Sequence, residues 1–467
     1  MGKDTGMGPG TRIAAGLATA LVLLASLQHD ETAAQGPGSA AGQPVPVAKP
    51  SGILPVVVEI PSSVKSAEDA RPFFDDFSWR SLIALNWPAD PARRGVPKSP
   101  GVPGVFLKAG PSYPAVWGSY REAYELFRLD GGRPPPFAAK EQWLPFCGGV
   151  PAGTKVLLMG TKSGTLLQAT SQSFSYPLVD QNLNYVYFEI RFNRDQYEFV
   201  RGGDKSPPSW LYLASNLAAA ESKAPISMPI SAPQPYQQGA VMLKAAWKQL
   251  AAHDPRYYTV PAVIYDPSSK TPCVKTQVGL IGFHIGHKVK DFPQWIWSSF
   301  EHVDNVPNDD GSNPPGPMTL NNGKKEPATV GGWADRPASQ NLVPKDHRVA
   351  AQVTRLNPIP TTPTGRSTVD INAAYRKALA GTVWANYQLV ITQWPTGATQ
   401  FQPKGPGVSY PTGSASPFPV DNAVNTAMET FFQSQGDAAG AGGNSCMRCH
   451  YNAGVADYSW SLLLRSH

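Results

Sequence analysis

Beyond its N-terminal segment, the chain lacks any apolar run long enough to cross a membrane. A membrane-spanning helix needs roughly 20 consecutive apolar residues. We therefore expect no transmembrane segment in the mature chain. The sequence also lacks a recognisable internal repeat.

Runs of positive charge are absent as well. The formal net charge is +6, which is mild when it is spread over 467 residues. No basic helix and no nucleic-acid-binding motif occurs. We therefore expect no nucleic-acid partner, whereas a mild positive charge is compatible with an acidic redox partner protein.

The signatures of several common enzyme classes are missing too. The sequence shows no Ser/His/Asp spacing, no phosphate-binding loop and no nicotinamide-binding fingerprint. It therefore offers no catalytic residues, and whether the chain is an enzyme stays open.

The N-terminus has the order of residues that is typical of an export signal. An apolar run at 13–27 follows weakly basic residues and precedes the small residues Thr32-Ala33-Ala34. We predict a signal peptide at 1–34, cleaved after Ala34, and a periplasmic or secreted mature protein. An uncleaved anchor is the alternative, but the apolar run is short for one.

The composition divides the rest of the chain into three parts. Residues 35–60 are rich in Gly, Ala, Ser and Pro and predict a flexible linker. Residues 61–435 predict a β-rich globular domain, and 436–467 a C-terminal attachment segment that packs on it. The expected fold class is α+β, with a sandwich-like or distorted-barrel β core, added helices and long Pro/Gly loops.

The periodicity of apolar residues predicts the main elements of this domain. One helix should lie within residues 70–87 and stop before Pro88. Asn193 should cap a short helix at 194–200. Further helices are expected at 115–128 and 421–435, and strands at 184–192, 241–248, 257–265, 278–287 and 387–394.

The strongest signal is the sequence Cys446-Met447-Arg448-Cys449-His450. Two cysteines three apart, followed at once by histidine, form the attachment signature of a c-type haem. Each thiol adds to one vinyl group of the porphyrin, and the histidine then takes one axial position on the iron. The motif predicts one covalently bound haem c per chain, with Cys446, Cys449 and His450 as its attachment residues.

Two other uses of this motif fit the sequence less well. A structural zinc site would need further ligands at knuckle spacing, and the remaining cysteines, Cys147 and Cys273, are distant and isolated. A thioredoxin-like pair would need a strand-to-helix context, whereas glycine-rich sequence precedes Cys446. Cys147 and Cys273 could form a disulfide in an oxidising compartment, but nothing in the sequence shows that they are close.

The haem motif resembles the attachment site of c-type cytochromes. The wider chain is similar to a little-characterised group of large exported bacterial "cytochrome c family" proteins. The similarity lies in the stretches FSWRSLIALNWP at 77–88, GFHIGHK at 282–288 and SFEHVDN at 299–305. This resemblance implies kinship and a haem cofactor, and it implies no particular reaction.

The second axial ligand of the iron is not evident from the motif. No methionine follows His450, in contrast to small soluble cytochromes c. The ligand would then come from an upstream residue or from His467 at the C-terminus, or the position would stay open. We predict His284 first, because it lies in the most strand-like segment that contains histidine, and His302 second. His287 and Met428 are weaker alternatives.

Some of these residues have other possible roles. His284, Glu301, His302 and Asp304 could instead assemble a non-haem metal site, although no three-ligand spacing supports one.

Two functions remain after this reading. The first is an exported monohaem cytochrome that carries electrons to or from a redox partner protein in the periplasm or outside the cell. The alternative is an exported haem-dependent oxidoreductase that acts on a small molecule or a peroxide at an open iron site. The size of the chain favours the second, and the lack of catalytic residues favours the first.

Overall fold

The computed structural model describes residues 47–110, 113–128, 130–140, 147–150, 154–158, 177–223, 226–265, 270–324, 345–395, 424–430, 446–451 and 453–465. The predicted signal peptide at 1–34, His467 and the glycine-rich stretch before Cys446 lie outside these ranges. The described part is an α+β fold with a β-rich core, as the sequence predicted, and this core is one large mixed sheet.

Eight strands make up this sheet. They are β1 (Arg121–Glu122), β2 (Lys155–Leu158), β3 (Tyr187–Phe192), β4 (Val241–Leu250), β5 (Thr259–Tyr265), β6 (Cys273–Val289), β7 (Phe292–His302) and β8 (Tyr387–Gln393). The α-helices are α1 (Ala67–Leu85), α2 (Pro103–Leu107), α3 (Ala123–Leu126), α4 (Arg194–Arg201), α5 (Ala214–Glu221), α6 (Thr368–Ala378), α7 (Cys446–Tyr451) and α8 (Trp460–Arg465). Short 3₁₀ turns lie at Trp117–Ser119, Lys345–His347, Val383–Asn386 and Gly454–Ala456.

The long strand β6 is the centre of the sheet. Along one edge it pairs with β4. Along the other edge its first half pairs with β5 and its second half with β7, so the sheet branches there. β8 extends the β7 branch, and β2 joins β5 in parallel, whereas the other strand pairs are antiparallel.

All five predicted strands are present. β3, β4, β5, β6 and β8 lie at the predicted places, and β6 is longer than its apolar core suggested. The sequence did not predict β7. From Gln294 to His302 every residue of β7 is buried, and several of them are polar. A strand covered on both faces shows no apolar–polar alternation, and so the pattern that marks a half-exposed strand is absent.

The helix α1 confirms the prediction for residues 70–87. It begins after Ser66, whose hydroxyl accepts a hydrogen bond from the backbone N–H of Asp69 at 3.0 Å, and it ends before Pro88. Ser78 on its buried face lies 2.7 Å from the hydroxyls of both Ser298 and Thr392. These contacts fix α1 against β7 and β8. The short helix capped by Asn193 is present as α4.

One other helix prediction was wrong, and another is tested only in part. Residues 115–128 form a 3₁₀ turn, the short strand β1 and the single turn α3, because Arg121 and Glu122 pair with β3. A capping box between Glu122 and Glu125 then starts α3. Of the helix predicted at 421–435, residues 424–430 are described, and they form turns.

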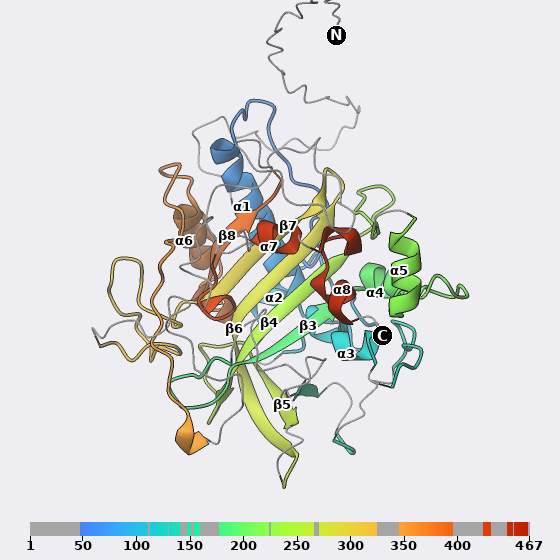
Figure 1. The fold of residues 1–467 in the computed structure, drawn as a ribbon. Helices are drawn as coiled ribbons and strands as arrows, with labels where there is room; N and C mark the ends of the chain where they lie inside the picture. Colours follow the sequence, from blue (N-terminus) through green and yellow to red (C-terminus); the bar gives the residue numbers. More distant parts are fainter. Residues whose placement is uncertain are drawn as a thin grey trace, which may run out of the picture.

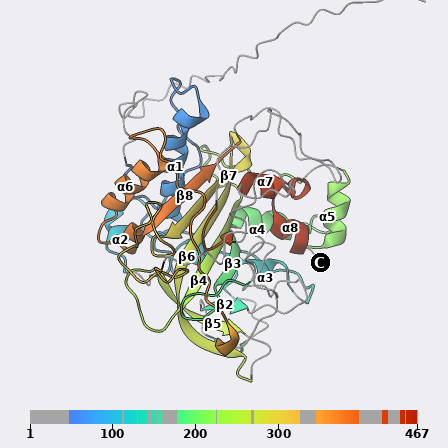
Figure 2. The ribbon, with the colours of Figure 1, turned by 60° about the vertical axis from the view of Figure 1, so that its left-hand side comes forward.

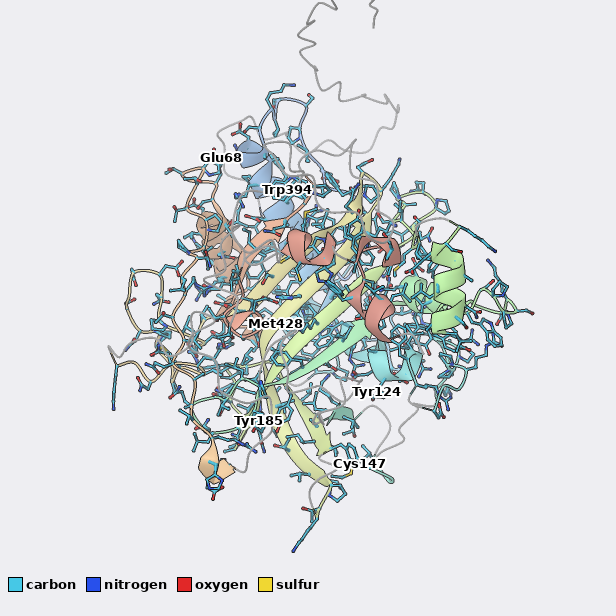
Figure 3. All side chains as sticks on the ribbon, in the orientation of Figure 1. Glu68, Tyr124, Cys147, Tyr185, Trp394 and Met428 are labelled. Atoms are coloured by element: carbon cyan, nitrogen blue, oxygen red, sulfur yellow. A yellow bond between two sulfur atoms is a disulfide. The ribbon has the colours of Figure 1, made fainter. Side chains whose placement is uncertain are left out.

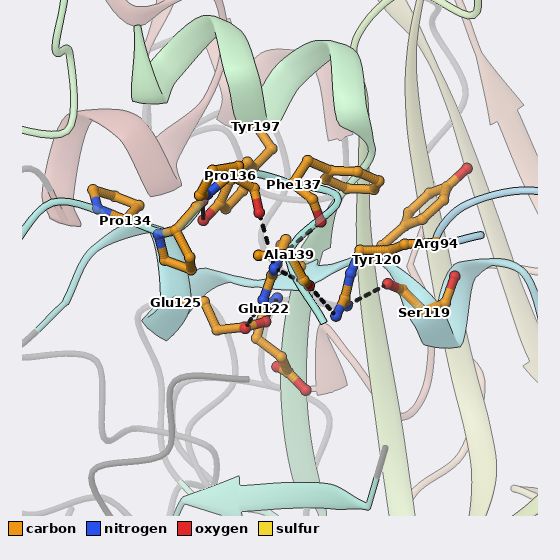
Figure 4. A network of polar contacts seen from close by, with 12 residues as sticks. Arg94, Ser119, Tyr120, Glu122, Glu125, Pro134, Pro136, Phe137, Ala139 and Tyr197 are labelled. Atoms are coloured by element: carbon orange, nitrogen blue, oxygen red, sulfur yellow. Dashed lines mark hydrogen bonds and ion pairs between the residues drawn. The ribbon is translucent and has the colours of Figure 1, made fainter. Parts of the chain in front are cut away.

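A fully buried arginine explains the tight path of the chain around β1. The guanidinium of Arg121 forms an ion pair with Glu125 at 2.5 Å. It also donates to the carbonyls of Pro136, Phe137 and Ala139 at 2.9, 3.2 and 2.7 Å (Figure 4). The loop at 134–139 is therefore tied to β1 through one side chain. Removing this guanidinium would take the donor from the carbonyls of Pro136 and Phe137, whereas Ala139 would keep a hydrogen bond from Arg94 at 3.2 Å.

The predicted linker is only partly a linker. Residues 47–60 pack on the domain: Leu54 and Val56 are buried. The carbonyl of Val56 accepts a hydrogen bond from Ser231 at 2.6 Å, and Gly52 donates its N–H to Pro100 at 2.9 Å. Leu54 and Val56, spaced two apart, thus anchor a stretch whose other side chains are mostly half-buried or exposed.

Cys147 and Cys273 form a disulfide, with their Cα atoms 5.6 Å apart. Cys147 lies beside the lower end of the sheet in Figure 3, and Cys273 is the first residue of β6. The bond therefore links Cys147 to the central strand β6. It also leaves Cys446 and Cys449 as the cysteines outside a disulfide.

Loss of this disulfide should destabilise the fold without touching the haem motif. The bond closes a loop between residues 126 apart in the sequence. Restricting so long a loop in the unfolded chain stabilises a protein by about 2–4 kcal/mol. We expect Cys147→Ala/Cys273→Ala to lower the free energy of unfolding by that amount, measured by denaturant titration. An unchanged midpoint would contradict this prediction.

The sheet separates two layers (Figure 2). Helices α1 and α6 lie on one side, and α7 and α8 lie on the other. On the α1 side, Phe77 stacks on His287 and Trp79 contacts Phe300. No helix among the described residues has the length and apolar character that a membrane span requires. The following sections concern the opposite side, which we call the C-terminal face.

Candidate haem-attachment site

Three rows of side chains on the sheet form the floor of the C-terminal face. Strand pairing aligns Lys244, His284 and Ser299 in the middle row. Met242, Gly286 and Trp297 form the row on one side of it, and Ala246, Gly282 and Glu301 the row on the other. Residues directly opposite in a sheet point to the same face. His284 therefore lies at the centre of this floor.

The segment 424–430 covers the row of Glu301. The backbone N–H and the hydroxyl of Thr426 donate to the Glu301 carboxylate at 3.0 and 2.8 Å. Asn425 donates to the Ser299 hydroxyl at 3.2 Å. A Cβ on Gly282 would lie only 2.9 Å from the Met428 side chain. Met428 therefore fills the space above Gly282 (Figure 3), so a flat ring has no room to approach the backbone there.

The segment from α7 to α8 covers the row of Trp297 (Figure 1). The backbone N–H of Met447 donates to the side chain of Gln393 on β8 at 3.2 Å. Ser459 and Ser461 lie 3.9 Å from the sulfur of Met242. The C-terminal segment thus packs on the main domain, across the same strands that carry His284.

The motif itself forms the helix α7. Cys446 and Cys449 stand one helical turn apart, are half-buried and carry free thiols. Burial raises the pKa of the Cys446 thiol well above its usual value and that of Cys449 to about 11, and the Glu429 carboxylate adds to both shifts. Both groups are therefore neutral thiols at physiological pH, and both lie within the electrostatic reach of Glu429.

His450 is held in a defined orientation. Its Nδ1 lies 2.7 Å from the carbonyl oxygen of Tyr458, and its ring packs on Trp297 with centroids 4.0 Å apart. Burial lowers the pKa of His450 to about 4. The imidazole is therefore neutral at physiological pH, and Nε2 makes no hydrogen bond to a described residue. A neutral imidazole whose Nδ1 is fixed by a carbonyl is the usual form of a metal-binding histidine.

A strained turn places the carbonyl that holds His450. Asp457 and Tyr458 both have left-handed backbone conformations, with φ of 52° and 65°. Residues with side chains adopt such angles rarely, and surrounding contacts must enforce them. The Asp457 carboxylate forms a buried ion pair with Lys288 at 2.5 Å and accepts the backbone N–H of Met228 at 2.6 Å. These contacts enforce the turn.

His284 lies beside a carboxylate of the other covering segment. Its Nε2 is 3.3 Å from the Glu429 carboxylate, an ion-pair distance without hydrogen-bond geometry. Burial raises the pKa of Glu429, but the neighbouring His284 and Lys244 outweigh it, and the net pKa lies below its usual value. The charges of His284, Lys244 and Glu429 all influence His450. The structure thus brings His284 within electrostatic reach of His450.

The structure gives His302 a different place and role. It is fully buried, its Nε2 lies 2.9 Å from the carbonyl of Arg256, and its Nδ1 accepts the N–H of Asp304 at 3.1 Å. The ring also stacks on Tyr257, with centroids 4.0 Å apart. Both ring nitrogens are therefore engaged, and we do not retain His302 as an iron ligand.

The weaker alternatives lie away from this position as well. His287 points to the α1 side of the sheet, where its Nε2 lies 2.6 Å from the carbonyl of Gln238. Met428 is fully buried against Gly282. His467 lies outside the described residues.

The alternative metal site at His284, Glu301, His302 and Asp304 does not assemble. Glu301 forms an ion pair with Arg355, and Asp304 forms a bidentate pair with Arg256 at 2.7 Å for both oxygens. Among the described residues, no group of three or more His, Cys, Asp and Glu side chains could hold a metal ion.

Sequence reasoning missed four residues of this site, namely Lys244, Trp297, Glu429 and Asp457. Strand alternation places Lys244 and Trp297 on a face, but the pairing register that sets them beside His284 and His450 is a long-range property. Glu429 and Asp457 follow no motif. No local signal in the sequence could have identified either one.

The residues present fit the cofactor that the motif implies. Two protonated thiols stand one turn apart, a neutral imidazole follows them, and a second imidazole lies across the same face. Thiols and imidazoles are the groups that hold a c-type haem. The fit depends on the kinds of donor group present, two thiols and two imidazoles, and on their position on the same face of the sheet.

Comparison with known proteins adds no relative. No protein-family model, no curated protein and no solved structure matches this chain.

Proposed function

We propose that the chain is an exported monohaem c-type cytochrome that carries electrons through a covalently attached haem. One observation supports this proposal best: the sheet places His284 on the face that the Cys446–His450 motif covers. The histidine and the motif lie far apart in the sequence. Their convergence is expected of a two-ligand haem site and is not required by the motif alone.

Each residue has a specific role in this proposal. The thiols of Cys446 and Cys449 bond the porphyrin, and Nε2 of His450 binds the iron, with Nδ1 held by Tyr458. His284 supplies the second imidazole. The bound haem supplies a one-electron couple at the iron. Two imidazoles would leave no coordination position for a substrate, which favours electron transfer.

The partner and the location belong to the same proposal. A cytochrome of this kind exchanges electrons with a redox partner protein in the periplasm or outside the cell. The predicted signal peptide at 1–34 supports that address, because haem c is attached outside the cytoplasm. The disulfide between Cys147 and Cys273 is consistent with an oxidising compartment.

A second function is favoured by one feature of His284. Its Nε2 faces Glu429, as in a pair that transfers protons. An exported haem oxidoreductase acting on a small molecule or a peroxide would use such a pair beside an open iron site. Carbon monoxide separates the two functions: it should leave the spectrum of the ferrous protein unchanged if both axial positions are filled. Rapid binding would favour the oxidoreductase.

Removing His284 should change the spin state of the iron. We expect His284→Ala to convert a low-spin ferric spectrum to high-spin, because one strong-field imidazole is lost. His302→Gln is the matched control, since His302 is engaged elsewhere. Optical and EPR spectra of the haem-loaded chain measure both. A low-spin spectrum in His284→Ala would remove His284 from the proposal.

A further inference from the structure

Two opposite charges flank His284 on the C-terminal face. Glu429 approaches its Nε2 to 3.3 Å from the covering segment. Lys244 is its direct neighbour on β4, and its ammonium lies 5.2 Å from the ring centroid of Phe188 on β3. The carboxylate thus lies beside the histidine, and Lys244 stands directly opposite it on β4, close enough to lower the pKa of Glu429.

Glu429 is fixed where it stands. One of its carboxylate oxygens accepts the backbone N–H of Asn425 at 3.2 Å. Asn425 in turn donates to the carbonyl of Phe300 at 2.7 Å. The position of the carboxylate is therefore set by β7 as well as by its own segment. The packing of the fold therefore holds the Glu429 carboxylate near His284.

The direction of the contact decides which nitrogen of His284 can bind iron. Because Nε2 faces the carboxylate, Nδ1 is the nitrogen left for a metal. A carboxylate that receives the N–H of a metal-bound imidazole makes that imidazole a stronger donor. A stronger donor, and a nearby negative charge, stabilise the more positive oxidation state of the metal. A nearby ammonium has the opposite effect.

We propose that Glu429 and Lys244 are positioning residues that set the reduction potential of the haem through His284, in opposite directions. Glu429 holds a negative charge 3.3 Å from Nε2 of His284 and favours ferric iron. Lys244 places a positive charge beside the same ring and favours ferrous iron. This inference rests on the proposed function, and in particular on His284 as the second ligand.

The test compares Glu429→Gln with Lys244→Met in the haem-loaded full chain. Glu429→Gln should raise the midpoint potential, and Lys244→Met should lower it, both measured by spectroelectrochemical titration. We expect each to change the ratio of reduced to oxidised protein at a fixed potential by about tenfold, which is 59 mV for one electron. Glu59→Gln and Lys65→Met are the matched controls, because both residues are exposed and belong to the N-terminal region.

A second measurement separates action through His284 from a general effect of charge. The ferric EPR spectrum of a low-spin haem responds to the donor strength of its axial imidazoles. Glu429→Gln should change its g-values, and Glu59→Gln should not. Equal g-values for Glu429→Gln and the wild type would overturn the role of the Nε2 contact.

The outcomes distinguish this inference from the proposed function. Low-spin, covalently bound haem with an unchanged potential in both variants would overturn the inference and leave the cytochrome standing. Absence of covalent haem in the wild type would overturn the cytochrome itself. If Glu429→Gln does not accumulate as folded protein, Lys244→Met decides alone, because a rise in its potential would contradict the proposed sign.

Discussion

The Cys446→Ala/Cys449→Ala double variant is expected to carry no covalently bound haem. Both thioether bonds require a thiol from this motif, and the other two cysteines are joined to each other. Haem staining of a denaturing gel measures the result directly, because only covalently attached haem stays with the chain. We expect complete loss of the stained band in the double variant.

The matched control is Cys147→Ala/Cys273→Ala, which removes as many thiols but spares the motif. It should keep the haem-stained band even if it lowers the free energy of unfolding. Single variants at Cys446 or Cys449 should retain haem weakly through one thioether. A stained band of normal strength in the double variant would show that the motif is not the attachment site and would end the proposal.

The haem site stays a prediction that rests on local chemistry in the sequence. The signature of Cys446, Cys449 and His450 lies within five consecutive residues, and it can be recognised without the structure. The preference for His284 over His302 rested on one strand and its faces. The structure places His284 on the same face as the motif and gives His302 two hydrogen-bond partners elsewhere.

Long-range contacts set the limit of that prediction. β7 is buried on both faces, and so its sequence does not alternate. Residues 115–128 have helical spacing of apolar side chains, but pairing of β1 with β3 overrides it. Likewise, the apolar residues of 424–430 suggested a helix, whereas their contacts with Glu301 and Gly282 hold turns. In each case tertiary contacts decided against the local pattern.

Two separate segments cover the floor around His284, and each brings a part of the site. The segment 424–430 brings Glu429, and the segment from α7 to α8 brings the motif and the Tyr458 carbonyl. Their positions depend on anchors to the sheet, Glu301 for the first and Lys288 for the second. The orientation of His450 should therefore respond to changes at Asp457, which does not touch it.

Replacing Asp457 should have the largest effect on stability among single substitutions at this face. In Asp457→Ala the ammonium of Lys288 would stay buried without its carboxylate, and the N–H of Met228 would lose its acceptor. Leaving one member of a buried ion pair uncompensated costs about 3–5 kcal/mol. We expect that loss in the free energy of unfolding, measured by denaturant titration. We also expect a change in the ferric spectrum of the haem-loaded chain, because the orientation of His450 would change.

The double variant Asp457→Asn/Lys288→Met tests the cause of this effect. Asparagine tolerates the left-handed backbone at position 457, and methionine removes the buried charge at 288. We therefore expect the double variant to recover most of the stability lost in Asp457→Ala and to restore the ferric spectrum that depends on the Tyr458 carbonyl. Equal instability of the two variants would contradict the ion pair as the cause. The loss of stability would then come from the turn itself, because both variants alter the strained backbone at Asp457 and Tyr458.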